Sequence, residues 1–141
     1  MRYVCDAPGS KVWFAIETEA EAIAESALME HAVEKYFSQA QEEAALSYRP
    51  LSQVSFEQNI GLGDHIRRTM PMFLTLRDAE GQGLATAMLP PPGQGDAGFR
   101  IIIVGCRNSD PYTEHGAAIE ALGAHLGFIL DRSRCYPYQR G

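Results

Sequence analysis

The chain has 141 residues, of which 45% are hydrophobic and 21% are charged, and its formal net charge is −6. This length suits one domain whose core needs neither a metal nor a disulfide to hold it together. The acidic balance argues against general nucleic-acid binding, which rests on a surplus of lysine and arginine. A local anion site stays open, because all of the 12 basic residues except Lys11 and Lys35 are arginines.

The sequence also bears on the compartment. Its first residues lack the basic segment and apolar stretch of a secretory signal, and no apolar run approaches the roughly 20 residues of a membrane-spanning helix. The 3 cysteines, Cys5, Cys106 and Cys135, give neither a disulfide framework nor a CxxC motif. We therefore expect a soluble, cytoplasmic protein without membrane contact. The richness in alanine and the preference for arginine indicate a GC-rich bacterial gene.

The N-terminal part predicts a hairpin followed by a helix. Residues 2–6 and 12–17 are rich in aromatic and β-branched side chains, which is typical of strands, and the Pro8-Gly9 pair between them predicts a turn. Thr18 and Glu21 have the spacing of a capping box at a helix start.

We predict one helix from about Glu19 to about Tyr48, ended by Arg49-Pro50. At 100° per residue its inner side carries small and apolar residues: Ala22, Ser26, Met29, Val33, Tyr36, Phe37, Ala40 and Ala44. Its outer side carries Glu21, Glu25, Lys35 and Glu42, together with His31, which we expect at the surface.

The second half predicts three strands. Residues 72–77 and 84–89 are strand-like, and the loop between them has hairpin composition. The proline-rich residues 90–95 predict an exposed connector. Residues 99–106 contain an unbroken apolar run, which predicts a central strand that is buried on both faces.

Ser109-Asp110-Pro111 predicts the start of a last helix that continues to about Leu130. The stripe of this helix that faces the sheet comprises Ile119, Leu122, Leu126, Ile129 and Leu130. Gly116, Gly123 and Gly127 line a neighbouring ridge, which favours contact with another helix, either in the fold or across a dimer. Residues 132–141 form a basic and aromatic tail, expected to be an edge strand or an arm on a partner.

These elements predict a single α+β domain covering residues 1–141. We expect a mainly antiparallel sheet of about five strands in the order ββα-βββα, with two main helices on one face. The same order of elements occurs in profilin-like and longin-like folds, which is an analogy of element order alone.

The first candidate site lies in the long connection over residues 49–71. Its second half groups Asp64, His65, Arg67 and Arg68 behind two glycines, and guanidinium groups near glycine-rich backbone suit a carboxylate or phosphate. The alternative is a short helix capped by Asp64 with both arginines in solvent.

The second candidate lies before the last helix. The Cys106 thiol near a helix N-terminus and beside Arg107 has the setting of a reactive thiolate. His115 would then act as the base, oriented by Asp110 or Asp64. The alternative is a buried structural cysteine and a histidine that belongs to the core.

Two functions follow from these candidates. The first is a non-enzymatic binding or assembly domain, expected to be a homodimer, that holds an anionic small molecule through Arg67 and Arg68 beside His65, with Arg107 as a further contact. The alternative is a small enzyme of acyl or thiol transfer that uses Cys106 and His115. We expect neither a metal nor a cofactor, because no HxxxH or CxxC pair is present.

Overall fold

The computed structural model describes residues 1–48, 61–92, 100–136 and 138. The strands are β1 (Arg2–Ala7), β2 (Lys11–Ile16), β3 (Met72–Arg77), β4 (Gly83–Leu89) and β5 (Ile102–Val104). The helices are α1 (Glu19–Met29), α2 (Val33–Leu46), α3 (Leu62–Thr69) and α4 (Tyr112–Leu126), and 3-10 turns cover Cys106–Asn108 and Arg132–Arg134. In this part of the chain the elements run ββαααβββα.

The 5 strands form one sheet in the order β1-β2-β3-β4-β5, and every neighbouring pair is antiparallel. Each strand therefore pairs with the next strand along the chain. The predicted α+β fold with a five-stranded antiparallel sheet is confirmed. Both predicted hairpins form, and Gly9 in the first turn has φ +81°, a conformation that costs glycine little.

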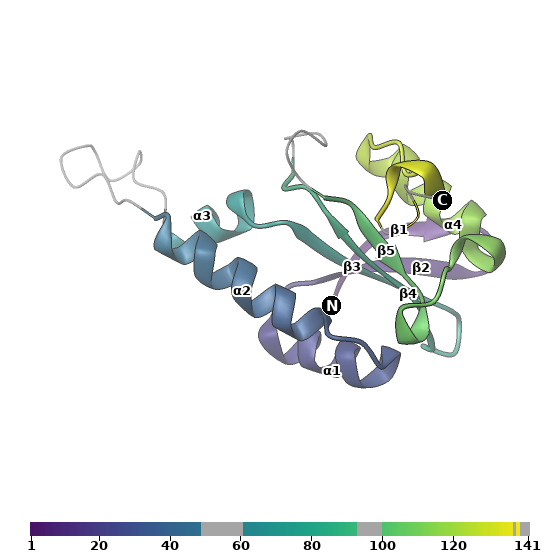
Figure 1. Cartoon of the computed structure of the whole chain (residues 1–141), viewed down its shortest axis with the longest axis horizontal. Coiled ribbons are helices and arrows are strands. Elements are labelled where there is room, and N and C mark those ends of the chain that lie inside the picture. Colours follow the sequence, from purple (N-terminus) through teal and green to yellow (C-terminus); the bar gives the residue numbers. More distant parts are fainter. Residues whose placement is uncertain (49–60, 93–99, 137, 139–141) are drawn as a thin grey trace.

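Helices cover both faces of the sheet, so the expectation that they lie on one face is wrong (Figure 1). The core under α4 joins Trp13, Leu76 and Ile103 to Leu122. A smaller core joins α1 and α2 to the opposite face of β2 and β3 and contains Ile16, Ala22, Val33, Phe37 and Phe73. Successive residues of a strand point to opposite faces, so one strand serves both cores.

The predicted long helix is two helices. α1 ends at Met29, because Glu30 adopts the left-handed conformation (φ 53°) and the backbone N–H of His31 returns to the carbonyl of Ser26. The Ser26 hydroxyl then accepts the N–H of Glu34 at 2.9 Å and satisfies a free donor in the first turn of α2. No glycine or proline marks the break, which is why the pattern missed it.

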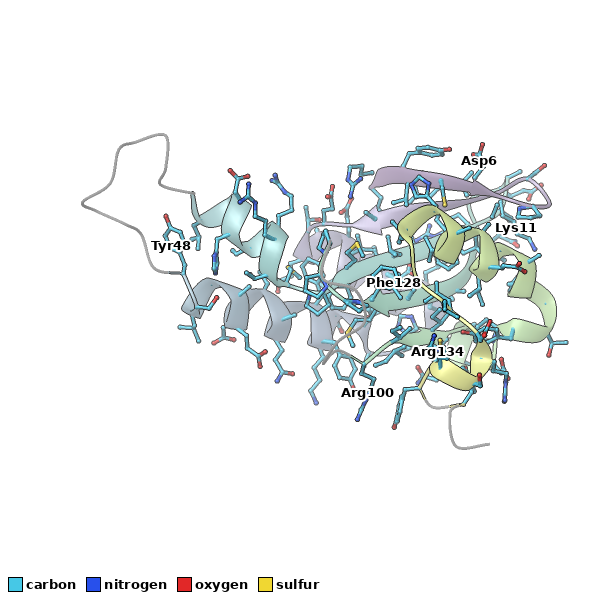
Figure 2. The ribbon with its side chains drawn as sticks, turned by 90° about the horizontal axis from the view of Figure 1, so that it is seen from above. Asp6, Lys11, Tyr48, Arg100, Phe128 and Arg134 are labelled. Atoms are coloured by element: carbon cyan, nitrogen blue, oxygen red, sulfur yellow. The ribbon has the colours of Figure 1, made fainter. Side chains whose placement is uncertain are left out.

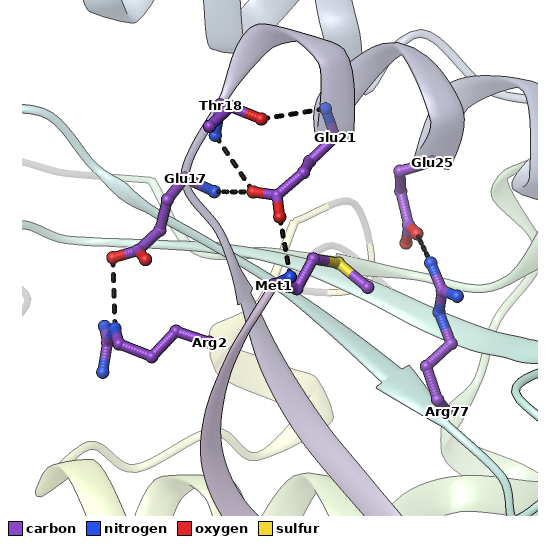
Figure 3. Close-up of polar contacts among 7 residues, drawn as sticks. All are labelled: Met1, Arg2, Glu17, Thr18, Glu21, Glu25 and Arg77. Carbon is purple, nitrogen blue, oxygen red and sulfur yellow. Dashed lines mark hydrogen bonds and ion pairs between the residues drawn. The ribbon is translucent and has the colours of Figure 1, made fainter.

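The capping box at the start of α1 is confirmed. Glu21 donates its N–H to the Thr18 hydroxyl at 3.1 Å, and its carboxylate accepts the N–H of Thr18 at 3.1 Å and of Glu17 at 2.8 Å (Figure 3). The same carboxylate pairs with the N-terminal ammonium of Met1 at 2.8 Å. These contacts hold the start of α1 against the beginning of β1.

β5 is an edge strand, not the predicted central one. It pairs with β4, and beyond it lies a single parallel bridge between Ile102 and Tyr136. Ile103 is fully buried under α4, while Ile102 and Val104 are half-buried on the other face. The unbroken apolar run thus reflects helices on both sides of the sheet.

α4 ends at Leu126 rather than near Leu130. Gly127 caps the helix in the left-handed conformation (φ +80°), and a Cβ on Gly123 would come within 2.6 Å of the Phe128 carbonyl oxygen. These two glycines therefore permit the chain to turn back, and this turn explains them without contact with another helix. Beyond the turn Ile129 is 58% exposed, so it is not part of the core stripe.

The described part of the tail packs on its own domain. Cys135 is fully buried, and the Tyr112 hydroxyl donates its one hydrogen to the Leu130 carbonyl at 2.8 Å, while its oxygen lies 2.9 Å from the Cys135 sulfur, whose S–H can donate to it. The Tyr138 ring meets Tyr112 edge-on at 5.7 Å. Residues 137 and 139–141 lie outside the described part.

Candidate functional site

A buried carboxylate lies between α1 and the sheet. Glu25 has no exposed surface, although the helical wheel placed it on the solvent side. It follows Ala22 by three residues and precedes Met29 by four, and both of those residues are also buried. That spacing puts all three residues on one face of the helix, so the buried face of α1 is wider than the helical wheel predicts.

Glu25 is held by two donors from the sheet. The Arg77 guanidinium donates Nη2–H to Oε1 at 2.6 Å (Figure 3). The Thr86 hydroxyl donates to Oε2 at 2.5 Å. Arg77 also donates Nε–H to the Thr75 hydroxyl at 3.1 Å. A buried charge requires such partners, because removal from water costs several kcal/mol that only pairing and hydrogen bonds offset.

His31 continues this set of contacts. Its Nε2 lies 2.8 Å from the Thr86 hydroxyl oxygen. Since that hydroxyl gives its hydrogen to Glu25, it accepts one from Nε2–H, and the hydrogen-bond pattern thereby assigns the neutral Nε2–H tautomer. The remaining nitrogen, Nδ1, accepts the N–H of Val33 at 3.4 Å. Burial lowers the pKa of His31, against the opposing effect of the Glu25 charge.

His31 and Thr86 form one corner of an apolar pocket of about 260 Å³. We call it the His31 pocket. Its other walls come from the α1–α2 connection, α2, β3, β4, β5 and the 3-10 turn before α4: Ala32, Val33, Tyr36, Phe73, Ala87, Met88, Ile102, Val104, Asn108 and Tyr136. The lining is mostly aliphatic and aromatic, with polar groups from His31, Thr86 and Asn108.

Two strained turns meet beside this pocket. Glu30, Arg107 and Asn108 all have left-handed backbone, with φ of 53°, 57° and 61°. Such conformations are unfavourable for residues other than glycine and tend to gather at functional sites. The Arg107 guanidinium donates to the Glu30 carboxylate at 2.8 Å and lowers the pKa of that group.

The residues of the second candidate do not form a catalytic pair. The Cys106 thiol is exposed and donates to Glu30 at 3.8 Å. His115 instead accepts a hydrogen bond from the Lys11 ammonium at 3.1 Å, and burial followed by the Lys11 charge lowers its pKa. Asp110 pairs with Arg132 at 2.7 Å. Arg107 and Cys106 thus lie near the His31 pocket, while His115 and Asp110 have other partners.

The first candidate is a short exposed helix, α3, as its alternative interpretation held. Gly61 rather than Asp64 is the N-cap residue, and Asp64 pairs with Arg67 at 3.1 Å across one turn. His65 contacts the Ser47 hydroxyl at 2.7 Å and the Tyr48 ring at 5.4 Å. Arg68 is exposed. Residues 49–60 of this connection lie outside the described part.

The two candidate sites lie at opposite ends of the molecule. Tyr48, the ring neighbour of His65, marks one end, and Lys11, the partner of His115, marks the other (Figure 2). Neither the His31 pocket nor the larger cavity beside α3 joins the 61–71 segment to the start of α4. The sites therefore do not combine into one.

Sequence reasoning missed Glu25, Thr86 and His31. The spacing around Glu25 was a usable signal, and a threonine in a strand under helices was a weaker one. His31 had no signal of this kind, because only the break between α1 and α2 turns its ring toward β4.

In the described ranges, no group of three or more His, Cys, Asp or Glu side chains is placed to hold a metal ion. None of the helices in those ranges combines the length and the apolar character needed to cross a bilayer.

Comparison with known proteins adds no relative. No family model matches the chain, and no match was found among curated proteins or among solved structures. The functional argument for this α+β domain therefore rests on its own residues.

Proposed function

We propose that this protein is a non-catalytic binding domain whose ligand is a small neutral molecule held in the His31 pocket. The observation that carries the proposal is an apolar pocket with one polar corner, backed by the buried chain of contacts from Glu25 through Thr86 to His31. Concave apolar pockets with a few fixed polar groups are the usual form of small-molecule sites.

The lining indicates the chemistry of the ligand. At about 260 Å³ the pocket is slightly smaller than typical ligand sites of roughly 300 Å³ and above, so it suits one ring with a short substituent. The rings of Tyr36, Phe73 and Tyr136 favour an aromatic group. Among the residues that the structure describes, no Asp, Glu, Lys or Arg side chain lines the pocket, so a charged ligand would lose its hydration without gaining an oppositely charged partner there.

Binding fits this geometry better than catalysis. Both ring nitrogens of His31 are engaged within the protein, and the Thr86 hydroxyl both donates and accepts. Neither group is poised to take a proton from a ligand. The Cys106 thiol contacts a carboxylate instead of a histidine, so the parts of a nucleophile and base pair are not together.

Titration with p-cresol, indole and benzoate tests the proposal. We expect p-cresol and indole to raise the melting temperature saturably, since a ligand of the folded state adds about 2.7 kcal/mol at 100 times its Kd. Benzoate should bind at least tenfold more weakly. NMR shift changes should centre on His31, Met88 and Val104.

Ile102→Trp fills the pocket from the edge strand and should abolish the p-cresol effect. Ile23→Trp is the matched control, because Ile23 is 49% exposed on α1 and does not line the pocket. NMR shift changes centred elsewhere in the wild type, or equal binding by the Ile102→Trp variant, would refute the proposal.

A cytoplasmic location and a homodimer stay predictions. Sedimentation equilibrium measures the second directly and is independent of the ligand experiment.

A further inference from the structure

A second cavity lies at the end of the sheet where β1 and β3 begin and β2 ends. It has a volume of about 640 Å³ and is walled by α2, α3, the ends of β1, β2 and β3, and the last turn of α4. We call it the α3 groove. It shares only Phe73 with the His31 pocket, so the two cavities have largely separate walls.

The wall formed by α3 is loosely packed. None of the residues of α3 is buried, and Ile66, which lines the groove, is only half-buried. Across from it lie Ile16, Phe37 and Met72. Apolar side chains on both walls leave an apolar surface that a hydrocarbon chain can cover, with the usual gain of about 25 cal/mol per Å².

Gly63 is a second sign of an occupant. It is the second residue of α3, and its backbone does not have positive φ. A Cβ at this position would meet none of the described residues within 4 Å. No contact in the described part therefore requires glycine here, whereas a ligand in the groove gains room from it, since Gly63 is part of the lining.

The rim of the groove carries two guanidinium groups. Arg2 contacts Glu17 and Arg67 contacts Asp64, in each case through one nitrogen at 3.1 Å. Their side chains are 63% and 72% exposed. A guanidinium has five N–H donors, so each arginine retains donors for a further acceptor, and its planar shape suits a carboxylate or phosphate oxygen pair.

We propose that the α3 groove binds an amphiphilic anion. The carboxylate or phosphate head contacts Arg67 and Arg2, and the hydrocarbon chain lies on Ile16, Phe37 and Ile66. Glu17 and Asp64 balance the charges of the two arginines, so the remaining guanidinium N–H donors are what would bind the anionic head. The apolar walls select an anion with a hydrocarbon chain. The proposal is independent of the ligand in the His31 pocket.

Calorimetric titration with dodecanoate below its micelle concentration tests the inference, with 1-dodecanol as the uncharged control. We expect saturable one-to-one binding of dodecanoate and at least tenfold weaker binding of dodecanol. Arg67→Gln should weaken dodecanoate binding about tenfold, as loss of a charged hydrogen bond does. Arg68→Gln is the matched control on the same helix, because Arg68 does not line the groove.

The substitution Gly63→Leu fills part of the groove, so it tests whether ligand binding can be lost without a loss of stability. Leucine raises helix propensity, so the melting temperature should hold or rise while dodecanoate binding is lost. Sedimentation with phosphatidylglycerol vesicles tests whether the anion bound in the groove is the headgroup of a membrane lipid or belongs to a free amphiphile. Equal binding of dodecanol, equal losses in Arg67→Gln and Arg68→Gln, or full binding by Gly63→Leu would overturn the proposal.

Discussion

The two faces of the sheet are formed by the same strands, but they bury different kinds of side chains. Under α4 the buried residues are almost all apolar, and Trp13 donates one hydrogen bond from its indole to the Ala118 carbonyl at 2.8 Å. Under α1 and α2 the buried surface includes Glu25, Thr75 and Thr86. The apolar face has the composition of a core that serves stability.

The face under α1 and α2, which we call the polar face, is expected to gain less free energy from burial than the apolar face does. A buried ion pair is often no more stabilising than apolar residues of the same size, so its presence calls for another reason. The position of Glu25 and Thr86 directly behind His31 supplies one, since together they fix the ring at the corner of a pocket. One face of the sheet is thus packed with apolar residues, and the other contains buried polar contacts behind the pocket proposed to bind the ligand.

The largest expected effect comes from breaking the buried pair. Arg77→Ala leaves the Glu25 carboxylate without its cationic partner and should cost about 3–5 kcal/mol of unfolding free energy, measured by urea denaturation. Replacing both residues by methionine should recover most of this loss, because no unpaired charge remains. Similar losses in the single and double variants would contradict the account of the polar face.

An intermediate effect is expected on the apolar face. Trp13→Phe removes the indole hydrogen bond to the Ala118 carbonyl and leaves a smaller side chain in a fully buried position, so the unfolding free energy should fall by about 1–3 kcal/mol. The His31 pocket should keep its affinity for p-cresol, because Trp13 does not line it. A loss of binding without a loss of stability would show that the two faces are coupled.

The smallest effect is the response to pH. Burial holds the folded-state pKa of His31 below its ordinary value of 6.5, so folding favours the neutral ring. That stabilisation is complete above pH 6.5 and is lost as the pH falls from 6.5 toward the folded pKa. Buried His115 acts in the same direction.

Urea denaturation from pH 7.5 to 5.5 measures this slope. His31→Gln should reduce the slope while its amide still donates to Thr86, and His115→Gln should remove a separate part. An unchanged slope in both variants would rule out histidine as the cause. The carboxylates Glu21 and Glu30 have lowered pKa values and ordinary values of 4.5, so they contribute only at lower pH.

Local signals predicted most elements because their causes are local. The Pro8-Gly9 turn, the Thr18–Glu21 capping box and the strands over residues 72–77 and 84–89 need only neighbouring residues to form. The end of α1 needs distant groups as well, since the ring of His31 is held by Thr86 in β4. A single-sequence pattern has no access to that contact.

The sequence by itself determined an α+β chain, its hairpins and the start of α1, and it left open whether Arg67 lies on a short exposed helix. Tertiary structure decided that helices cover both faces, that β5 lies at an edge, and that Glu25 and His31 meet Thr86. The physical reason is that periodicity records which side of an element is apolar, whereas a buried polar group is tolerated only where another element brings its partner. Sites of that kind form only when the elements assemble.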